Sequence, residues 1–288
     1  MPYLLSLLLP ALLFSGLSVP PQDVDSDDPD TVIIRGLWRS GEMARFELSE
    51  TVRIFEDGQL SGERQQSTLV HVDVAARTPG QRYVLIWQML ETNAVLFGDP
   101  ALDQFMHSLI ADGIVIETDG YGGIRQSTNM SDIFGHFKNA ALELDEANHW
   151  TGREPFRQQL QLYLDDESLF ESLLMRDIRF MFGLHGVELR LDQVFEYQTW
   201  QENPWGAAAE STGLLFIEDY DEARQILTVV NEVRLPQPLP EGHPVLEETQ
   251  RYDIQARTGW LQEVWLTDVI DFDGIRRERE LHIQKVPF

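Results

Sequence analysis

The chain has 288 residues, 43% of them hydrophobic, and its 22 basic and 48 acidic residues give a formal net charge of −26. This apolar content can bury a large core, which excludes wholesale disorder and allows either two small domains or one large β-rich unit. The acidic balance argues against nucleic acid as a partner, because such a surface repels phosphate backbones. Cysteine is absent, which excludes disulfides, thiol nucleophiles and acylation at a lipobox cysteine.

Residues 1–18 are predicted to form a secretory signal peptide. They carry no charged side chain, contain an apolar run from Tyr3 to Phe14 and end in small residues, with Gly16 and Ser18 placed to suit a cleavage site. The run is too short for a membrane span, which needs about 20 residues. We therefore expect an exported protein, periplasmic or extracellular, whose mature chain has no transmembrane span.

Residues 19–35 are expected to be an acidic flexible linker, because proline and like charges both oppose compaction. Alternate aspartates from Asp23 resemble the start of a calcium loop. The sixth position of that loop is Asp28 rather than glycine, and the twelfth is Ile34 rather than glutamate. The linker is therefore the better interpretation of this segment.

Three strands are predicted in succession in the first part of the remaining chain. Between Phe46 and Ile54, apolar residues alternate with polar ones, which indicates a half-buried strand ending at Asp57-Gly58. A second strand places valines at alternate positions from Val70, and it ends in a turn at residues 78–81. A third, residues 83–90, is apolar on both faces, which suggests a central strand covered on both sides.

Helices are expected in the middle of the chain. Asp99 and Pro100 have the residue types of a helix start, and that helix should end near Gly113. The glycine-rich segment 119–123 fits a hairpin between two short strands and lacks the third glycine of a dinucleotide-binding loop. Three further helices should begin near residues 129, 155 and 168, the last with a capping box Ser168-x-x-Glu171.

The last hundred residues return to alternating patterns with turn residues between them. The predicted strands are 187–197, 214–218, 226–235, 251–256, 261–270 and 275–286. Because no helix intervenes, we expect an antiparallel meander. The strands-helices-strands order predicts an α+β fold, in which a strongly curved antiparallel β-sheet packs against amphipathic helices, with residues 36–288 forming a single domain or two closely packed halves.

The segment Arg251 to Leu261, with the sequence RYDIQARTGWL followed by two outward strands, resembles the end of an uncharacterised family of exported bacterial β-rich proteins. The order of elements over most of the mature chain also resembles that of LolA-like and LppX-like envelope carriers. The resemblance to these carriers implies a half-barrel sheet closed by helices around an apolar cavity that holds acyl chains. The chain departs from lipid-anchored members by lacking a lipobox cysteine, and neither resemblance supplies catalytic residues.

Motifs for enzyme chemistry are missing from the sequence. There is no Gly-x-Ser-x-Gly elbow, no His-Glu-x-x-His and no P-loop, and the seven histidines form no closely spaced pair. We therefore predict no catalytic residue, no metal ligand and no cofactor, and we favour a non-enzymatic protein. A carboxylate-dependent hydrolase stays open as a lesser alternative, because 48 acidic residues offer many spatial pairs.

Two non-enzymatic functions remain open. In the first, the protein binds a hydrophobic or acyl ligand, a small molecule or lipid, between the third strand and the helices. In the second, the helices fill the sheet completely and the protein is a structural or interaction scaffold without a ligand cavity. The residues expected to line a ligand in the first case are Tyr83, Leu85, Trp87, Phe105, Phe134, Phe137, Phe170 and Leu174.

Overall fold

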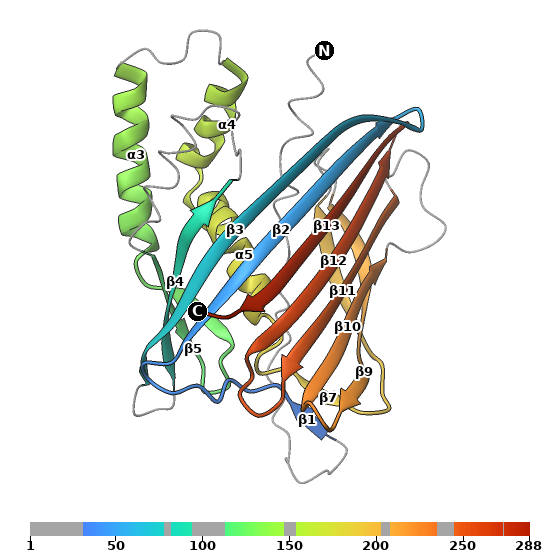
Figure 1. The fold of residues 1–288 in the computed structure, drawn as a ribbon. Coiled ribbons are helices and arrows are strands. Elements are labelled where there is room, and N and C mark those ends of the chain that lie inside the picture. The colour runs from blue at the N-terminus through green and yellow to red at the C-terminus, as the bar shows by residue number, and fades with distance from the viewer. Residues whose placement is uncertain are drawn as a thin grey trace.

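A computed structural model describes residues 31–77, 82–93, 113–146, 154–202, 208–234, 245–272 and 274–288 (Figure 1). Its main feature is an 11-stranded antiparallel sheet in the order β6-β5-β4-β3-β2-β13-β12-β11-β10-β9-β8. The strands of this sheet are β2 (Met43–Glu56), β3 (Gln59–Arg77), β4 (Tyr83–Thr92), β5 (Ile114–Thr118), β6 (Ile124–Ser127), β8 (Phe195–Glu202), β9 (Ala208–Asp221), β10 (Ile226–Arg234), β11 (Val245–Gln255), β12 (Leu261–Phe272) and β13 (Ile275–Val286). A second small sheet pairs β1 (Thr31–Ile33) with β7 (Glu188–Arg190).

The pairing of β2 with β13 joins the two halves of the chain into one sheet. The register runs from Arg45 opposite Val286 to Glu56 opposite Ile275, so the two strands pair along nearly their whole length. On either side of this pair, each strand is hydrogen-bonded to its neighbour in sequence. The predicted antiparallel meander is thus present in both halves, and the predicted order of strands, helices and strands is confirmed.

The shape of the sheet differs from the expectation. The sheet is large and antiparallel, but it is not strongly curled and the helices are few. Its edge strands β6 and β8 do not pair with each other, so it takes the ordinary twist of an open sheet rather than wrapping around the helices.

Two of the strand predictions are corrected. The strand from Tyr83 does not occupy the centre of the sheet, since only β5 and β6 lie beyond it. From Tyr83 to Gln88 its residues alternate between buried and half-buried, and Leu90 is exposed. The single strand predicted over residues 187–197 is instead the separate strands β7 and β8. The chain turns after Arg190, so β7 and β8 are separate strands: β7 pairs with β1 in the small sheet, and β8 belongs to the main sheet.

The described helices are α3 (Met130–Glu146), α4 (Glu154–Asp165) and α5 (Glu167–Phe182). Helix α5 is capped by Asp166, not by Ser168 as predicted: the Asp166 Oδ1 atom accepts hydrogen bonds from the backbone nitrogens of Ser168 and Leu169 at 2.9 and 3.2 Å. A carboxylate at this position satisfies two of the free N–H groups of the helix start. The helix predicted from Asp99 to near Gly113 falls almost entirely outside the described residues.

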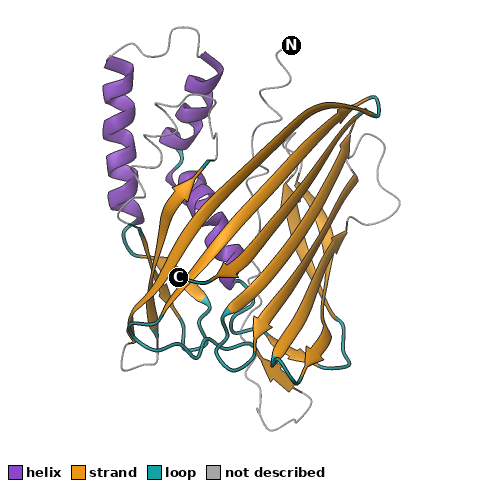
Figure 2. Ribbon diagram, in the orientation of Figure 1, coloured by secondary structure: helices purple, strands orange, loops and turns teal. Residues whose placement is uncertain are grey.

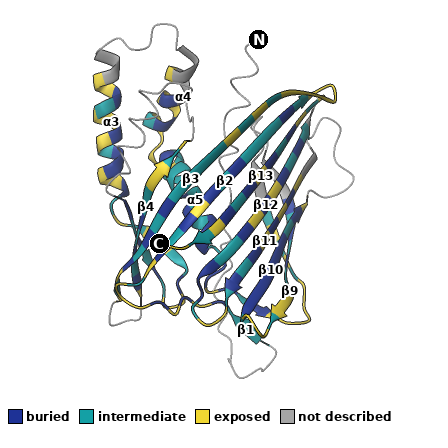
Figure 3. Ribbon diagram, viewed as in Figure 1, coloured by how far each residue is buried: buried dark blue, intermediate teal, exposed yellow. Residues whose placement is uncertain are grey.

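The helices are unevenly placed on the sheet. Helices α3 and α4 stand beside the β4 end of the sheet, and α5 lies behind it in the view of Figures 1 and 2. Phe180 of α5 lies 5.5 Å from Tyr252 of β11 between ring centroids, and Phe182 lies 5.7 Å from Trp38. The main hydrophobic cluster therefore joins α5 to one face of the sheet, here called the inner face (Figure 3). Within the described part of the chain, no helix has the length and apolar character needed to cross a membrane.

Candidate functional site

A band of buried polar side chains crosses the inner face of the sheet. On β2 the inward-facing alternation begins with buried Phe46 and Leu48 and continues with Glu50, whose exposure is only 5%. Neighbouring strands change from apolar to polar at about the same level. We call the following residues the polar band: Arg64 and Gln66 of β3, Glu50 of β2, Arg277 and Arg279 of β13, Asp268 of β12, Glu248 and Gln250 of β11, Asn231 of β10 and Tyr197 of β8.

Arginines and carboxylates alternate at the centre of the band. Asp268 accepts a hydrogen bond from Arg277 Nη2 at 2.7 Å and lies 3.4 Å from Arg279 Nη1. Arg279 Nε donates to Glu50 at 2.6 Å, and Arg64 adds a longer ion pair to Glu50 at 3.6 Å. Apart from Arg64, these side chains are at most 7% exposed. Charges so deeply buried are tolerated only when they are paired, which explains why the two signs alternate.

A neutral arm extends the band toward the β8 edge. Gln250 donates to Glu248 and accepts from Asn231 Nδ2 at 3.3 Å, and the Tyr197 hydroxyl donates to Asn231 Oδ1 at 2.9 Å. Tyr197 reaches Asn231 because its ring crosses β9 over Gly213, where any Cβ atom would overlap the ring. The glycine is thus required by the close approach of the tyrosine, and the arm spans four strands.

Helix α5 adds a further arginine above the band. Arg176 is bonded to Asp177 at 2.8 Å, and its side chain is 15% exposed. Burial alone would raise the pKa of Glu50, but the positive charges of Arg279, Arg176 and Arg64 lower this pKa to about 2. Glu50 therefore stays ionised at neutral pH, held by guanidinium groups from two strands and one helix.

Glu248 behaves in the opposite way. Burial raises its pKa to about 8, and the nearby negative charge of Asp268 contributes in the same direction, against the hydrogen bond from Gln250 and the charges of Arg279 and Arg277. At neutral pH its carboxyl group is therefore mostly protonated. A protonated carboxyl group has an O–H to donate, which ionised Glu50 and Asp268 lack.

Several polar atoms of the band lack a partner. Among the described residues, Nε of Arg64, Nε of Arg277 and Oε1 of Gln66 are buried without a hydrogen bond. An unsatisfied buried polar group costs about 1–3 kcal/mol, and more when it is charged. Native proteins contain few such groups, and each one calls for a physical explanation, of which a bound ligand is one. The band therefore combines buried charge with free hydrogen-bonding capacity.

The residues predicted to line a ligand lie in the apolar core beside this band. Tyr83, Leu85 and Trp87 are buried on the inner face of β4. The rings of Phe134, Phe137 and Phe170 are also buried and pack on one another, with centroids 4.5–6.3 Å apart. Leu174 is only partly buried against the same cluster. Phe105 lies outside the described residues, and a ligand-lining role for the set stays a prediction.

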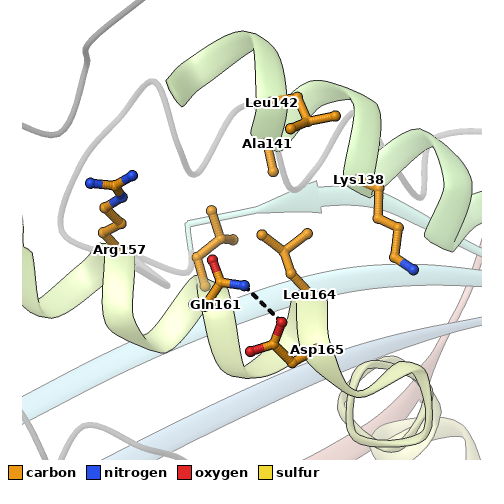
Figure 4. Close-up of a pocket in the computed structure, with 8 residues that line it drawn as sticks. Lys138, Ala141, Leu142, Arg157, Gln161, Leu164 and Asp165 are labelled. Carbon is orange, nitrogen blue, oxygen red and sulfur yellow. Dashed lines mark hydrogen bonds between the residues drawn. The ribbon is translucent and has the colours of Figure 1, made fainter. Parts of the chain in front are cut away.

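A pocket of about 290 Å³ opens between α3 and α4 (Figure 4). Ala141, Leu160 and Leu164 supply apolar surface, while Lys138 and Arg157 flank the opening. The polar residues Gln161 and Asp165 bond to each other at 2.7 Å across one turn of α4. The pocket is half open, and no buried unsatisfied side-chain atom of the described residues lines it, so it makes a weaker candidate than the band.

Sequence reasoning did not find the polar band, although each strand carries a signal. Glu50 interrupts the apolar alternation of β2, and Asp268 does the same in β12, where it follows Val264 and Leu266. A charged residue on the buried side of an alternating strand marks an interior polar site. No three His, Asp or Glu side chains of the described segments gather as a metal site.

No family model matches the sequence, and no curated protein matches it either. The functional assignment therefore rests on the geometry of the band and of the apolar surface beside it.

Proposed function

We propose that this protein is an exported, non-enzymatic binding protein whose ligand is an amphiphile with an acyl or similar apolar tail. The observation that carries the proposal is the set of unpartnered polar atoms in the band, Arg277 Nε among them, on the sheet face that also carries the apolar core. A molecule with a polar head and an apolar tail matches both surfaces at once.

Part of the apolar surface between α5 and β4 is incompletely covered. Leu173 and Leu174 of α5 and Met89 of β4 pack against the main cluster while staying partly exposed. Leu173 lies three residues before Arg176, so the two side chains share one face of α5. A partly exposed leucine thus lies beside an arginine whose charge acts on Glu50 of the band, as the two ends of an amphiphile require.

The second candidate is a carboxylate-dependent hydrolase, and one observation favours it. The band brings Glu50 and Glu248 to the same sheet face with pKa values displaced in opposite directions, to about 2 and about 8, as an acid and a base require. However, Glu50 and Asp268 are both bound by arginines, so neither of these two carboxylates of the band is free to act as base or nucleophile. Binding therefore fits the geometry better than hydrolysis.

Titration of the purified, delipidated chain with a fluorescent fatty-acid analogue tests the proposal. We expect saturable binding that Leu173→Gln weakens, since this change puts an amide on the apolar surface. Leu162→Gln is the matched control, because Leu162 of α4 is 52% exposed, and it should leave the titration unchanged. An absence of saturable binding to the unaltered chain would favour the scaffold alternative and overturn the proposal.

A further inference from the structure

We infer that the polar band selects a head group that is an oxyanion with a single negative charge. This inference rests on the proposed function, since it specifies the ligand class of the same site. Fatty acids, which carry a carboxylate, and lipids whose head is a phosphodiester both present such a group. The selection follows from the charge of the band and from its free hydrogen-bond donors.

The charges that interact across the band do not cancel. Four arginines belong to this set, Arg64, Arg176, Arg277 and Arg279. Three ionised carboxylates oppose them, because Asp177, Glu50 and Asp268 each bind a guanidinium at 2.6–2.8 Å. The fourth carboxyl, Glu248, is mostly protonated at neutral pH. The described set therefore carries 4 − 3 = +1, in a chain whose formal net charge is −26.

One ligand charge of −1 would neutralise this set. A neutral head would leave one buried positive charge uncompensated, and a dianion would leave one negative charge in excess. Uncompensated charge is costly in an interior where few water molecules can screen it. The balance thus favours a monoanion over both alternatives.

The free donors are those that an oxyanion needs. Nε of Arg277 and Nε of Arg64 have no partner among the described residues, and each lies beside the Nη atoms that already bind Asp268 and Glu50. Guanidinium donors form their strongest hydrogen bonds with anionic oxygens. Protonated Glu248 adds one O–H donor to the band.

Protonation of Glu248 should control the preference of the band for an anionic over a neutral head group. The groups that face it are Asp268 of β12, Arg277 and Arg279 of β13, and Gln250 on its own strand. When Glu248 ionises above about pH 8, the set becomes neutral without a ligand. An anionic head should therefore lose its advantage over a neutral head as the pH rises through this range.

Binding of three ligands with the same 12-carbon tail to the full-length, delipidated chain tests the inference. Dodecanoate and a lysophosphatidylglycerol with a 12-carbon chain carry one negative charge, and dodecanol carries none. At pH 7 we expect at least one of the monoanions to bind about tenfold more tightly than dodecanol or better, the effect of a charge-assisted buried hydrogen bond. The monoanion that binds more tightly identifies the source of the head group.

Arg277→Met should reduce the preference for the monoanion over dodecanol to less than about threefold. Arg276→Met is the matched control, since Arg276 is the preceding residue on β13 and its side chain is 48% exposed, and it should keep the full preference. Arg64→Met, at a position that is 28% exposed, gives the same test if Arg277→Met does not fold.

The outcomes separate the two proposals. If no ligand binds saturably, the proposed function fails. If dodecanol binds as tightly as both monoanions, or if neither arginine change alters the preference in a folded protein, the protein binds amphiphiles but the head-group inference is wrong.

Discussion

Arg279 donates a hydrogen bond from Nε to Glu50 at 2.6 Å, although 229 residues separate them in the sequence. Both side chains are about 5–6% exposed, and their strands β13 and β2 are neighbours in the sheet. In chain order, β2 and β13 are the first and last strands of the main sheet. The buried pair links them in addition to their backbone hydrogen bonds. It also anchors the charged centre of the polar band.

Breaking this pair from either side should destabilise the protein strongly. Glu50→Gln removes the nearest carboxylate from the buried Arg279 guanidinium, and Arg279→Met removes the nearest guanidinium from buried Glu50. Each change should cost about 3–5 kcal/mol of unfolding free energy. The double variant should cost less than the sum of the two single changes. Urea denaturation measures these differences. Arg53→Met, which removes an exposed pair with Glu280 between the same two strands, should change stability little.

Gly213→Ala should loosen the neutral arm of the band. The added Cβ would overlap the ring of Tyr197, so the ring must move and its hydroxyl should lose Asn231. Such overpacking costs about 1–3 kcal/mol. Gly62→Ala on β3 is the control, because open space surrounds that glycine. If the two variants are equally stable, the placement of the Tyr197 ring over β9 does not require a glycine at position 213.

Stability should depend on Glu248 above pH 5. Its pKa in the folded protein, about 8, lies above the ordinary value of 4.5. The stabilisation from its proton is therefore complete below about pH 4.5 and is lost as the pH rises toward 8. The expected loss is about 1.4 kcal/mol per pH unit within this range. Glu248→Gln should flatten the curve measured by urea denaturation, while Glu247→Gln, an exposed neighbour, should not.

Glu50 should affect stability at acidic pH, on the other side of its ordinary pKa of 4.5. Its pKa of about 2 lies below 4.5, so its contribution is complete above about pH 4.5 and is lost as the pH falls toward 2. Acid titration of Glu50→Gln should show a shallower loss of stability than that of the unaltered chain. Parallel curves for the two proteins would contradict the account of the buried pair.

Salt should stabilise the protein as a whole. With 48 acidic and 22 basic residues, repulsion between surface charges opposes folding. The screening length falls from roughly 10 Å at 0.1 M to about 3 Å at 1 M salt. We therefore expect the melting temperature to rise from low to molar NaCl by more than it rises in a neutral osmolyte. A melting temperature that is independent of NaCl would contradict the repulsion argument.

Much of the fold follows from local patterns in the sequence. The hairpin of β5 and β6 was predicted, because Asp119 to Gly123 has the turn residues that join two short strands. The alternation of β13 likewise predicts Ile275–Val286. The pairing of β2 with β13 was not predicted, since it depends on which edges of two separate meanders meet. The strong curvature predicted for the sheet was wrong, because local alternation does not determine how an open sheet bends over many strands.

The candidate site was harder to predict than the fold. Glu50, Asp268 and Arg279 occupy inward positions of their strands, but a single charged residue in an alternating strand can be explained by a bend or a bulge. Only the long-range register places the three side chains at one level of one face. The apolar neighbours Tyr83, Leu85 and Trp87 were predicted to line a ligand on a strand that is apolar on both faces. They are buried, and the ligand-lining role stays a prediction.

Native mass spectrometry of the protein, purified without detergent from its own source, tests the central claim most directly. We predict a complex of the chain with one amphiphile, which denaturation releases as an acyl compound carrying a single negative charge. A spectrum that contains only the bare chain, from protein that also takes up no dodecanoate when it is added in excess, would contradict the claim that the inner face of the sheet is a binding site.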